Sequence, residues 1–207
     1  MEAVDKIKQS AVAYRHCYVV ELMGRYCGYL AFMGGLATGA EQVYLHEEGM
    51  TLRDLEADLA QLTQGFEQDK RLALVVRNEY ANPVYTTDFI AALFEEEGSD
   101  LFDVRREILG HLQQGGNPSP FDRIQATRLA AKCIEFLISA AGESLAAAAF
   151  IGLEAGEVQF HSLADLPSVV DEAHQRPHQQ WWLRLRTVAN TLGQPAPRSP
   201  HASTADE

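Results

Sequence analysis

The chain has 207 residues, of which 46% are apolar and 22% are charged, and this composition predicts one packed domain or part of a larger one. Its 29 acidic and 17 basic residues give a net charge of −12, which excludes a general attraction to nucleic acid or to an anionic membrane. No stretch approaches the roughly 18 apolar residues of a membrane span, and the N-terminus has no apolar signal core. Three cysteines without CxxC spacing indicate reduced thiols in a cytosolic protein.

Hydrophobic periodicity predicts strands that alternate with helices along the chain, which is typical of an α/β fold with a mainly parallel sheet. Thr51 and Asp54 form a capping box at the start of one of these helices. We expect one domain over residues 1–192 and disorder over residues 193–207, which lack large apolar side chains. The expected helices cover residues 1–11, 30–40, 51–66, 86–98, 119–142 and 179–192, and the expected strands cover 16–22, 42–45, 72–77, 106–110 and, more weakly, 149–160.

The first strand is followed by the turn MGRYCGY, and ligands of parallel sheets bind at such carboxyl ends of strands. Gly24 permits a tight turn, Arg25 follows it, and Gly28 opens the next helix. Arg25 and the helix N-terminus together could bind an anion. The alternative is an ordinary strand–helix turn with a solvent-facing arginine.

The strand LALVVR is followed by Asn78 and Glu79. The Glu79 carboxylate could accept hydrogen bonds from two hydroxyl groups of a sugar. It could equally form an ion pair with Arg77, and the sequence leaves both interpretations open.

The segment GHLQQGG follows the expected strand at residues 106–110. Polar side chains at the end of an apolar strand need hydrogen-bond partners, so His111, Gln113 and Gln114 indicate a bound ligand. The two glycines would let that ligand approach the backbone. Arg105 lies six residues before His111, so in an extended strand the two side chains would lie on the same face. Together they could bind an anion. Ser119 is the expected N-cap of the helix that follows.

Motifs for chemistry on a bound ligand are not found in the sequence. It has neither GxxxxGK[ST] nor GxGxxG, no His/Cys cluster has the spacing of metal ligands, and no Asp or Glu is marked as a general base. The residues therefore predict binding of a phosphorylated, hydroxyl-rich molecule without catalytic residues or a metal site.

Four segments together resemble ATP-dependent 6-phosphofructokinases, most closely the C-terminal half of the duplicated animal-type enzyme. They occur in the order of that family over residues 5–186: VVELMGRYCGYLAFMGGLATGAE, RNEYANPVYTTDFI, LGHLQQGGNPSPFDR and QQWWLRLR. The resemblance implies a three-layer αβα, phosphofructokinase-like fold that is incomplete at its N-terminus.

The resemblance also implies binding roles for the polar strand ends. In that family the turn corresponding to Met23, Gly24 and Arg25 contacts the sugar phosphate. The glutamate at the position of Glu79 binds the furanose hydroxyls, and the arginine at the position of Arg105 reaches a phosphate, often across a subunit interface.

His111, Gln113 and Gln114 correspond to family residues that contact the second end of the sugar. Gln114 matches regulatory halves, which bind fructose 2,6-bisphosphate, whereas catalytic halves have arginine there; Arg25 matches the catalytic type instead. His16 replaces a family arginine, and Arg176 lies one residue after the position of another, so a bisphosphate should bind more weakly, by roughly 1.5–3 kcal/mol for each missing contact.

The resemblance implies that this chain is part of a cytoplasmic enzyme of glycolysis. That enzyme transfers a phosphoryl group from ATP to fructose 6-phosphate and requires Mg²⁺. The nucleotide loops and the catalytic aspartate of the family precede this segment, so the segment is expected to bind neither ATP nor Mg²⁺ and to be inactive alone. Its expected partners are fructose 6-phosphate or fructose 2,6-bisphosphate, the N-terminal half and further subunits, the family being tetrameric. This hypothesis predicts open sheet edges and exposed apolar surface.

The alternative is a stand-alone, non-catalytic regulatory module that binds a phosphosugar. A plain structural domain would leave the polar strand ends unexplained. A pyrophosphate-using relative is disfavoured by the animal-type segment QQWWLRLR.

Overall fold

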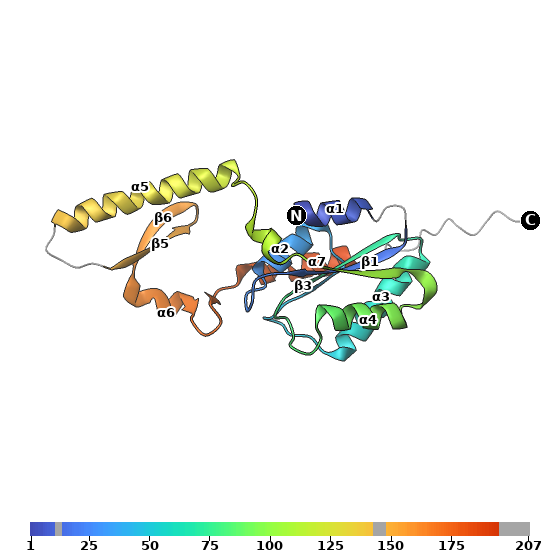
Figure 1. Ribbon diagram of the computed structural model, residues 1–207. Helices are drawn as coiled ribbons and strands as arrows, with labels where there is room; N and C mark the ends of the chain where they lie inside the picture. The colour runs from blue at the N-terminus through green and yellow to red at the C-terminus, as the bar shows by residue number, and fades with distance from the viewer. Residues whose placement is uncertain (11–13, 143–147, 195–207) are drawn as a thin grey trace, which may run out of the picture. The chain divides into compact units, whose positions relative to one another are not determined.

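The computed structural model describes residues 1–10, 14–142 and 148–194 of the chain (Figure 1). Its contacts divide the chain into two compact units. Unit 1 comprises Met1–Gln113 together with Trp181–Glu207, and unit 2 comprises Gln114–Gln180. The single domain expected over residues 1–192 stays a prediction. Within the described part of the chain, no helix is long and apolar enough to cross a membrane.

Unit 1 is built on a four-stranded sheet in which the strand order is β2-β3-β1-β4. The strands are β1 (His16–Leu22), β2 (Gln42–Tyr44), β3 (Leu72–Asn78) and β4 (Asp103–Ile108). All three pairings are parallel, and Glu21 of β1 lies opposite both Arg77 of β3 and Ile108 of β4. The carboxyl ends of β3, β1 and β4 therefore lie side by side at one edge.

Helices cover both faces of this sheet, which confirms the three-layer αβα prediction. Their apolar side chains form one core between the sheet and α3 and α4, and a second core between the sheet and α1, α2 and α7. Alternate residues of β1 serve the two cores, with Val19 in the first and Val20 in the second. The helices are α1 (Glu2–Ser10), α2 (Tyr29–Thr38), α3 (Leu52–Glu67), α4 (Thr87–Glu97) and α7 (Arg186–Gly193), with 3₁₀ turns η2 (Ser99–Leu101), η3 (Gly110–Gln114) and η5 (Trp181–Leu185).

Helix α3 shows why the local predictions succeed. The Thr51 hydroxyl accepts a hydrogen bond from the Asp54 N–H, and the Asp54 carboxylate accepts one from the Thr51 N–H, so the predicted capping box is confirmed. Leu55, Leu59 and Phe66 of its apolar face are buried against the sheet.

The prediction for β4 was wrong in its bounds. The strand begins at Asp103 and ends at Ile108, whereas residues 106–110 were expected. Gly110 then has a φ of 46°, and His111 lies in the 3₁₀ turn η3 rather than in an extended strand. Arg105 and His111 are therefore not related by strand alternation, and the argument that placed them on one face does not hold.

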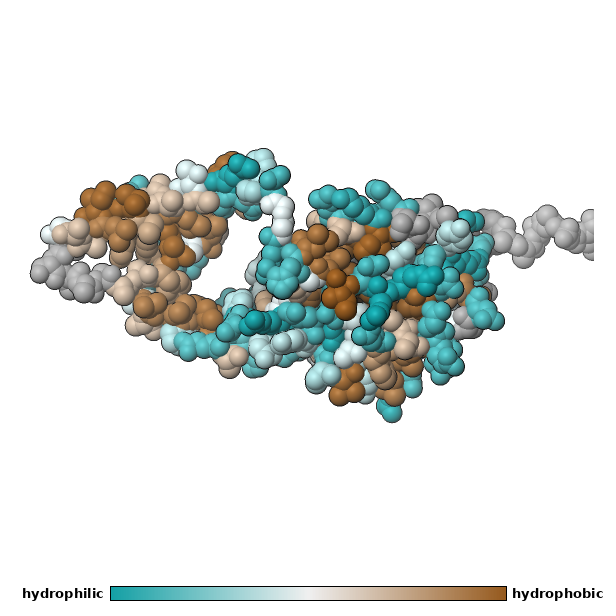
Figure 2. Space-filling view, viewed as in Figure 1, coloured by the Kyte–Doolittle hydropathy of each residue, from teal (hydrophilic) through white to brown (hydrophobic). Residues whose placement is uncertain are grey.

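Unit 2 consists of a long helix and short strands. Helix α5 (Pro120–Gly142) has no buried residue, and its Phe136 ring stacks on Phe160 of a β-hairpin, with ring centroids 4.9 Å apart. Figure 2 shows apolar residues along α5, and its exposed apolar side chains are Phe121, Ile124, Ile134, Leu137 and Ile138. The remaining elements are β5 (Ala149–Glu154), β6 (Glu157–Ser162), η4 (Leu163–Asp165), α6 (Leu166–Val169), β7 (Val170–Asp171) and β8 (Arg176–Pro177).

The C-terminal segment returns to unit 1. The helix expected over residues 179–192 is the turn η5 followed by α7, which packs beside β2. The Gly193 carbonyl accepts a hydrogen bond of 2.8 Å from Gln61 of α3, so Gly193 belongs to this helix and not to the predicted tail. Residues 195–207 lie outside the described part of the chain.

Candidate functional site

The turn after β1 has a backbone conformation that only certain residues adopt. Gly24 has a φ of 152°, and a Cβ atom there would lie 2.4 Å from the Cys27 carbonyl oxygen. Arg25 has a φ of 46°, which costs a residue with a side chain on the order of 1 kcal/mol. This conformation directs successive backbone N–H groups of the turn toward acceptors in the loop after β3 and in η3.

The Glu79 carboxylate provides the main acceptor for this turn. Its Oε1 accepts hydrogen bonds from the N–H groups of Gly24, at 3.0 Å, and Arg25, at 2.7 Å. The Glu79 N–H in turn donates to the Leu22 carbonyl at 2.9 Å. The carboxylate of Glu79 thus stabilises the turn through Oε1, whereas Oε2 accepts no hydrogen bond from the described residues and could accept one from a ligand hydroxyl.

Gln113 completes the group from the side of β4. Its side-chain oxygen accepts a 2.7 Å hydrogen bond from the Met23 N–H, although the two residues are 90 positions apart. His111 lies in the same 3₁₀ turn and is exposed. The structure therefore brings together Met23, Gly24, Arg25, Glu79 and Gln113, which we call the turn site.

The N-terminus of α2 is occupied by another carboxylate. Glu47 accepts a 2.8 Å hydrogen bond from the Gly28 N–H, and a Cβ atom at Gly28 would lie 2.7 Å from the second Glu47 oxygen. The negative charge that a helix N-terminus favours is thus already supplied by the Glu47 carboxylate. The expected anion site at Gly28 is not free in this structure.

A pocket of about 570 Å³ lies beside Glu79. Its volume is within the range of small-molecule sites. Tyr26, His46 and Tyr80 contribute aromatic rings that meet edge to face, with centroids 5.1 and 5.3 Å apart. A second pocket, of about 700 Å³ and lined by α3 and α4, contains Glu56, Glu67 and Glu97, and its negative charge does not suit a phosphate.

His16 and Arg105 lie away from the turn site. His16 is the first residue of β1, and Arg105 lies opposite Tyr18 in the register of β1 and β4. At about 3.3 Å per residue, the backbone of Arg105 lies about 16 Å before the level of Met23. His16 Nε2 and Arg105 Nη2 both approach Asp103 Oδ2, at 3.7 and 3.8 Å. The expectation that Arg105 joins the turn site of the same chain is therefore corrected.

The last two predicted residues, Gln114 and Arg176, belong to unit 2. Arg176 Nε lies 3.8 Å from Asp171 Oδ2, which also contacts His174 Nδ1 at 2.7 Å. The hydrogen bond from His174 lowers the pKa of Asp171. Arg176 is therefore already close to a carboxylate within its own unit.

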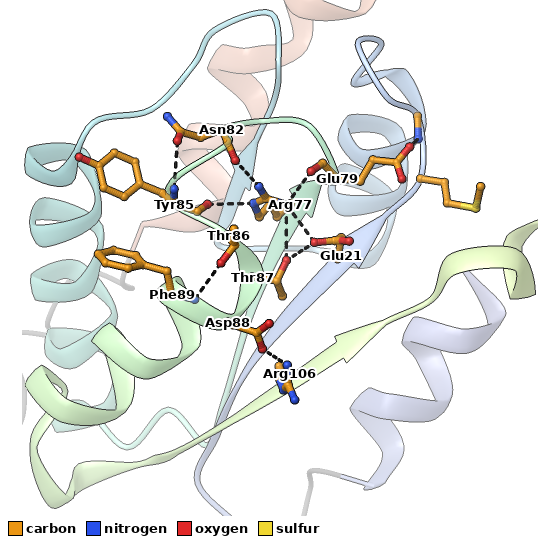
Figure 3. Close-up of polar contacts among 12 residues, drawn as sticks. Glu21, Arg77, Glu79, Asn82, Tyr85, Thr86, Thr87, Asp88, Phe89 and Arg106 are labelled. Carbon is orange, nitrogen blue, oxygen red and sulfur yellow. Dashed lines mark hydrogen bonds and ion pairs between the residues drawn. The ribbon is translucent and has the colours of Figure 1, made fainter.

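Sequence reasoning passed over an ion pair beneath the turn site. Arg77 is 2% exposed, and its Nη1 lies 2.9 Å from Glu21 Oε2 (Figure 3). The two residues lie directly opposite each other on β1 and β3. Opposite charges near the ends of two neighbouring apolar strands were the signal that could have revealed this pair.

Comparisons with known proteins agree with the fold and with the motifs. The family model described as Phosphofructokinase matches residues 1–137. The human muscle-type ATP-dependent 6-phosphofructokinase is 42% identical over 199 residues, which are 91% of this chain and 26% of that protein. The enzyme of Dictyostelium discoideum is 44% identical over 194 residues, which are 93% of this chain and 23% of that protein. The chain thus spans about a quarter of the length of these relatives.

Solved structures give the same picture. Phosphofructokinase from Saccharomyces cerevisiae superposes with a TM-score of 0.88 and 34% identity, over 93% of this chain and 27% of that chain. A pyrophosphate-dependent phosphofructokinase from Marinobacter aquaeolei has a TM-score of 0.60 and 17% identity, over 98% of this chain and 54% of that chain, and this likeness concerns the fold alone.

Proposed function

The chain belongs to the phosphofructokinase family, and we propose that it is the sugar-phosphate-binding part of a 6-phosphofructokinase. The proposed ligand is fructose 6-phosphate or the activator fructose 2,6-bisphosphate. Phosphoryl transfer from ATP to fructose 6-phosphate, a step of glycolysis in the cytoplasm, is proposed for the whole protein. This chain spans about a quarter of the length of its relatives.

The observation that carries this proposal is the turn site. A carboxylate, an amide side chain and three backbone N–H groups converge at the carboxyl ends of three adjacent parallel strands, beside a pocket of about 570 Å³. Parallel sheets bind ligands at this edge. Glu79 Oε2 would accept hydrogen bonds from the furanose hydroxyls, and the Arg25 guanidinium and the exposed His111 would face phosphate groups.

The choice between the two ligands depends on Gln114. A glutamine donates neutral hydrogen bonds, whereas an arginine would add a full charge toward a phosphate. We therefore favour an effector site for fructose 2,6-bisphosphate over a catalytic site. Arg25 supports the catalytic type, and a comparison of the two affinities decides between them.

ATP and Mg²⁺ belong to the complete enzyme in this proposal. Among the described residues, no three His, Cys, Asp or Glu side chains are grouped so that they could hold a metal ion, and Glu47 occupies the helix terminus at Gly28. We assign no step of the phosphoryl transfer to these residues. We propose that this chain alone is inactive and that the missing part of the enzyme supplies the nucleotide site.

Further subunits have a place in this proposal. Arg105 lies on the edge strand β4, and its side chain is 55% exposed. It is therefore available to a phosphate bound by a neighbouring copy, with His16 beside it. The exposed apolar side chains of α5 support a further partner, the missing half of the enzyme.

Calorimetric titration of the purified chain with each sugar phosphate tests the proposal. We expect saturable binding of one ligand per chain. Glu79→Gln should lower the affinity about tenfold or more, because a hydrogen bond to a charged group contributes about 1.5–3 kcal/mol. Glu96→Gln removes the same charge from an exposed position on α4 and should leave the affinity unchanged.

A folded chain that binds neither sugar phosphate would refute the site. Equal affinities of the Glu79→Gln and Glu96→Gln variants would show that Glu79 does not contact the ligand. Turnover of fructose 6-phosphate and ATP by this chain would contradict the proposed inactivity.

A further inference from the structure

Arg77 connects the loop after β3 to β1 through a buried hydrogen-bond network. Its Nη1 donates to the Glu21 carboxylate and to the Glu79 carbonyl, both at 2.9 Å. Its Nη2 donates to the Asn82 carbonyl at 2.7 Å, and its Nε donates to the Tyr85 carbonyl at 3.1 Å. Figure 3 shows these acceptors arranged around the guanidinium group. Four of its five N–H groups thus bind protein atoms.

The partners of Arg77 explain why a guanidinium is present in this position. Burial lowers the pKa of Arg77, and the Glu21 carboxylate opposes this effect. Glu21 is held in turn by the Thr87 hydroxyl at the start of α4. The three carbonyl acceptors lie in the loop between β3 and α4, outside the sheet, and a planar group with fixed donors can satisfy all three at once.

The same network determines where the Glu79 carboxylate lies. The Glu79 N–H donates to Leu22 on one side, and the Glu79 carbonyl accepts from Arg77 on the other. The backbone of Glu79 is thereby fixed at both of its polar groups. Its carboxylate lies under the turn, where Gly24 and Arg25 donate to it.

We propose that Arg77 is a positioning residue for ligand recognition: together with Glu21 it holds Glu79 in the orientation that binds the hydroxyl groups of the sugar. Arg77 itself is buried and acts through Glu79 rather than on a phosphate. This inference rests on the proposed function of the turn site, and it adds a specificity determinant that lies in the sheet.

A double-mutant cycle separates this role from a merely structural one. Arg77→Lys keeps the charge beside Glu21 but loses the fixed fork of donors. It should lower the affinity for the sugar phosphate about fivefold or more, and in the background of Glu79→Gln it should cause almost no further loss. The affinity for inorganic phosphate, which has no sugar hydroxyls, should stay within about twofold of the wild type.

The control is Arg106→Lys, since Arg106 forms an exposed ion pair with Asp88 and should not affect either ligand. If Arg77→Lys fails to fold, as judged by circular dichroism, Thr87→Val replaces it in the cycle. That variant removes the hydroxyl that holds Glu21 and leaves the guanidinium in place.

The outcomes distinguish this inference from the proposed function. Two results would overturn the positioning role alone. One is that the affinity losses of Arg77→Lys (or Thr87→Val) and Glu79→Gln simply add in the double mutant. The other is that Arg77→Lys (or Thr87→Val) lowers the affinity for inorganic phosphate as much as the affinity for the sugar phosphate. If the wild type binds no sugar phosphate, the proposed function fails and the positioning role fails with it.

Discussion

Replacing Asp58 with asparagine should make the folded chain more stable at neutral pH. Asp58 lies on α3, where its Oδ2 accepts a 2.8 Å hydrogen bond from the hydroxyl of the buried Tyr44. Burial raises the pKa of Asp58 from 3.8 to about 6, although Tyr44 and Arg186 oppose the change. Asparagine keeps an acceptor for Tyr44 and removes the charge that folding must desolvate.

The magnitude follows from the two pKa values of Asp58. The folded state binds its proton more tightly than the unfolded state, so the contribution of Asp58 to stability is fully present below about pH 4 and is lost as the pH rises through 6. A gap of about two pH units corresponds to about 3 kcal/mol. Because Asp58 is partly exposed, screening by solvent reduces this to about 1–2 kcal/mol.

Urea unfolding of both proteins at several pH values, followed by circular dichroism, measures the effect. The Asp58→Asn variant should gain about 1–2 kcal/mol in the free energy of unfolding at pH 7.5 and lose this advantage near pH 4. Glu56→Gln on the exposed side of the same helix is the control and should follow the wild type. A difference between Asp58→Asn and the wild type that is constant across the pH range would refute the reasoning.

Two further predictions concern ligand affinity. Gly24→Ala should lower sugar-phosphate affinity about tenfold or more, because its Cβ would clash with the Cys27 carbonyl and shift the turn. The control Gly39→Ala, also at a positive φ but with open space around it, should reduce stability and leave the affinity unchanged. Unchanged binding by Gly24→Ala would contradict the turn site. Gln114→Arg should raise the affinity for fructose 6-phosphate about tenfold and make this affinity more sensitive to salt. The control Gln159→Arg, at an exposed position, should change neither the affinity nor its salt dependence. Identical titrations of these two variants would argue against a phosphate near Gln114.

Local sequence signals predicted most of unit 1 because its elements are strongly patterned. The strands β1 and β3 were found within a residue, since each is a run of apolar residues that serves two cores. The start of α3 was found from the Thr51 capping box. The edge strand β4 was misplaced because DVRREI has no apolar alternation, and its bounds are set by backbone pairing with β1.

The turn site could be predicted in its residue types but not in its contacts. Glu79 was identified as a polar strand end, yet its partners Gly24 and Arg25 lie more than 50 positions earlier. Arg105 was grouped with the turn site from its even spacing to His111 and from motif order, whereas His16 was grouped with it from motif order. The strand register, which the sequence does not reveal, places them toward the opposite end of β1.

The second core of unit 1 includes Trp182 and Ala189, so two of its buried side chains come from the last segment of the chain. A ribosome that has translated all four strands still has unit 2 to synthesise before it reaches them. During that interval the nascent sheet would expose part of its interior, and chaperones that hold growing chains would be its natural ligands. We therefore expect unit 1 to complete its folding only after Trp182 and Ala189 have left the ribosome, and a chain that stops just before Trp181 should aggregate.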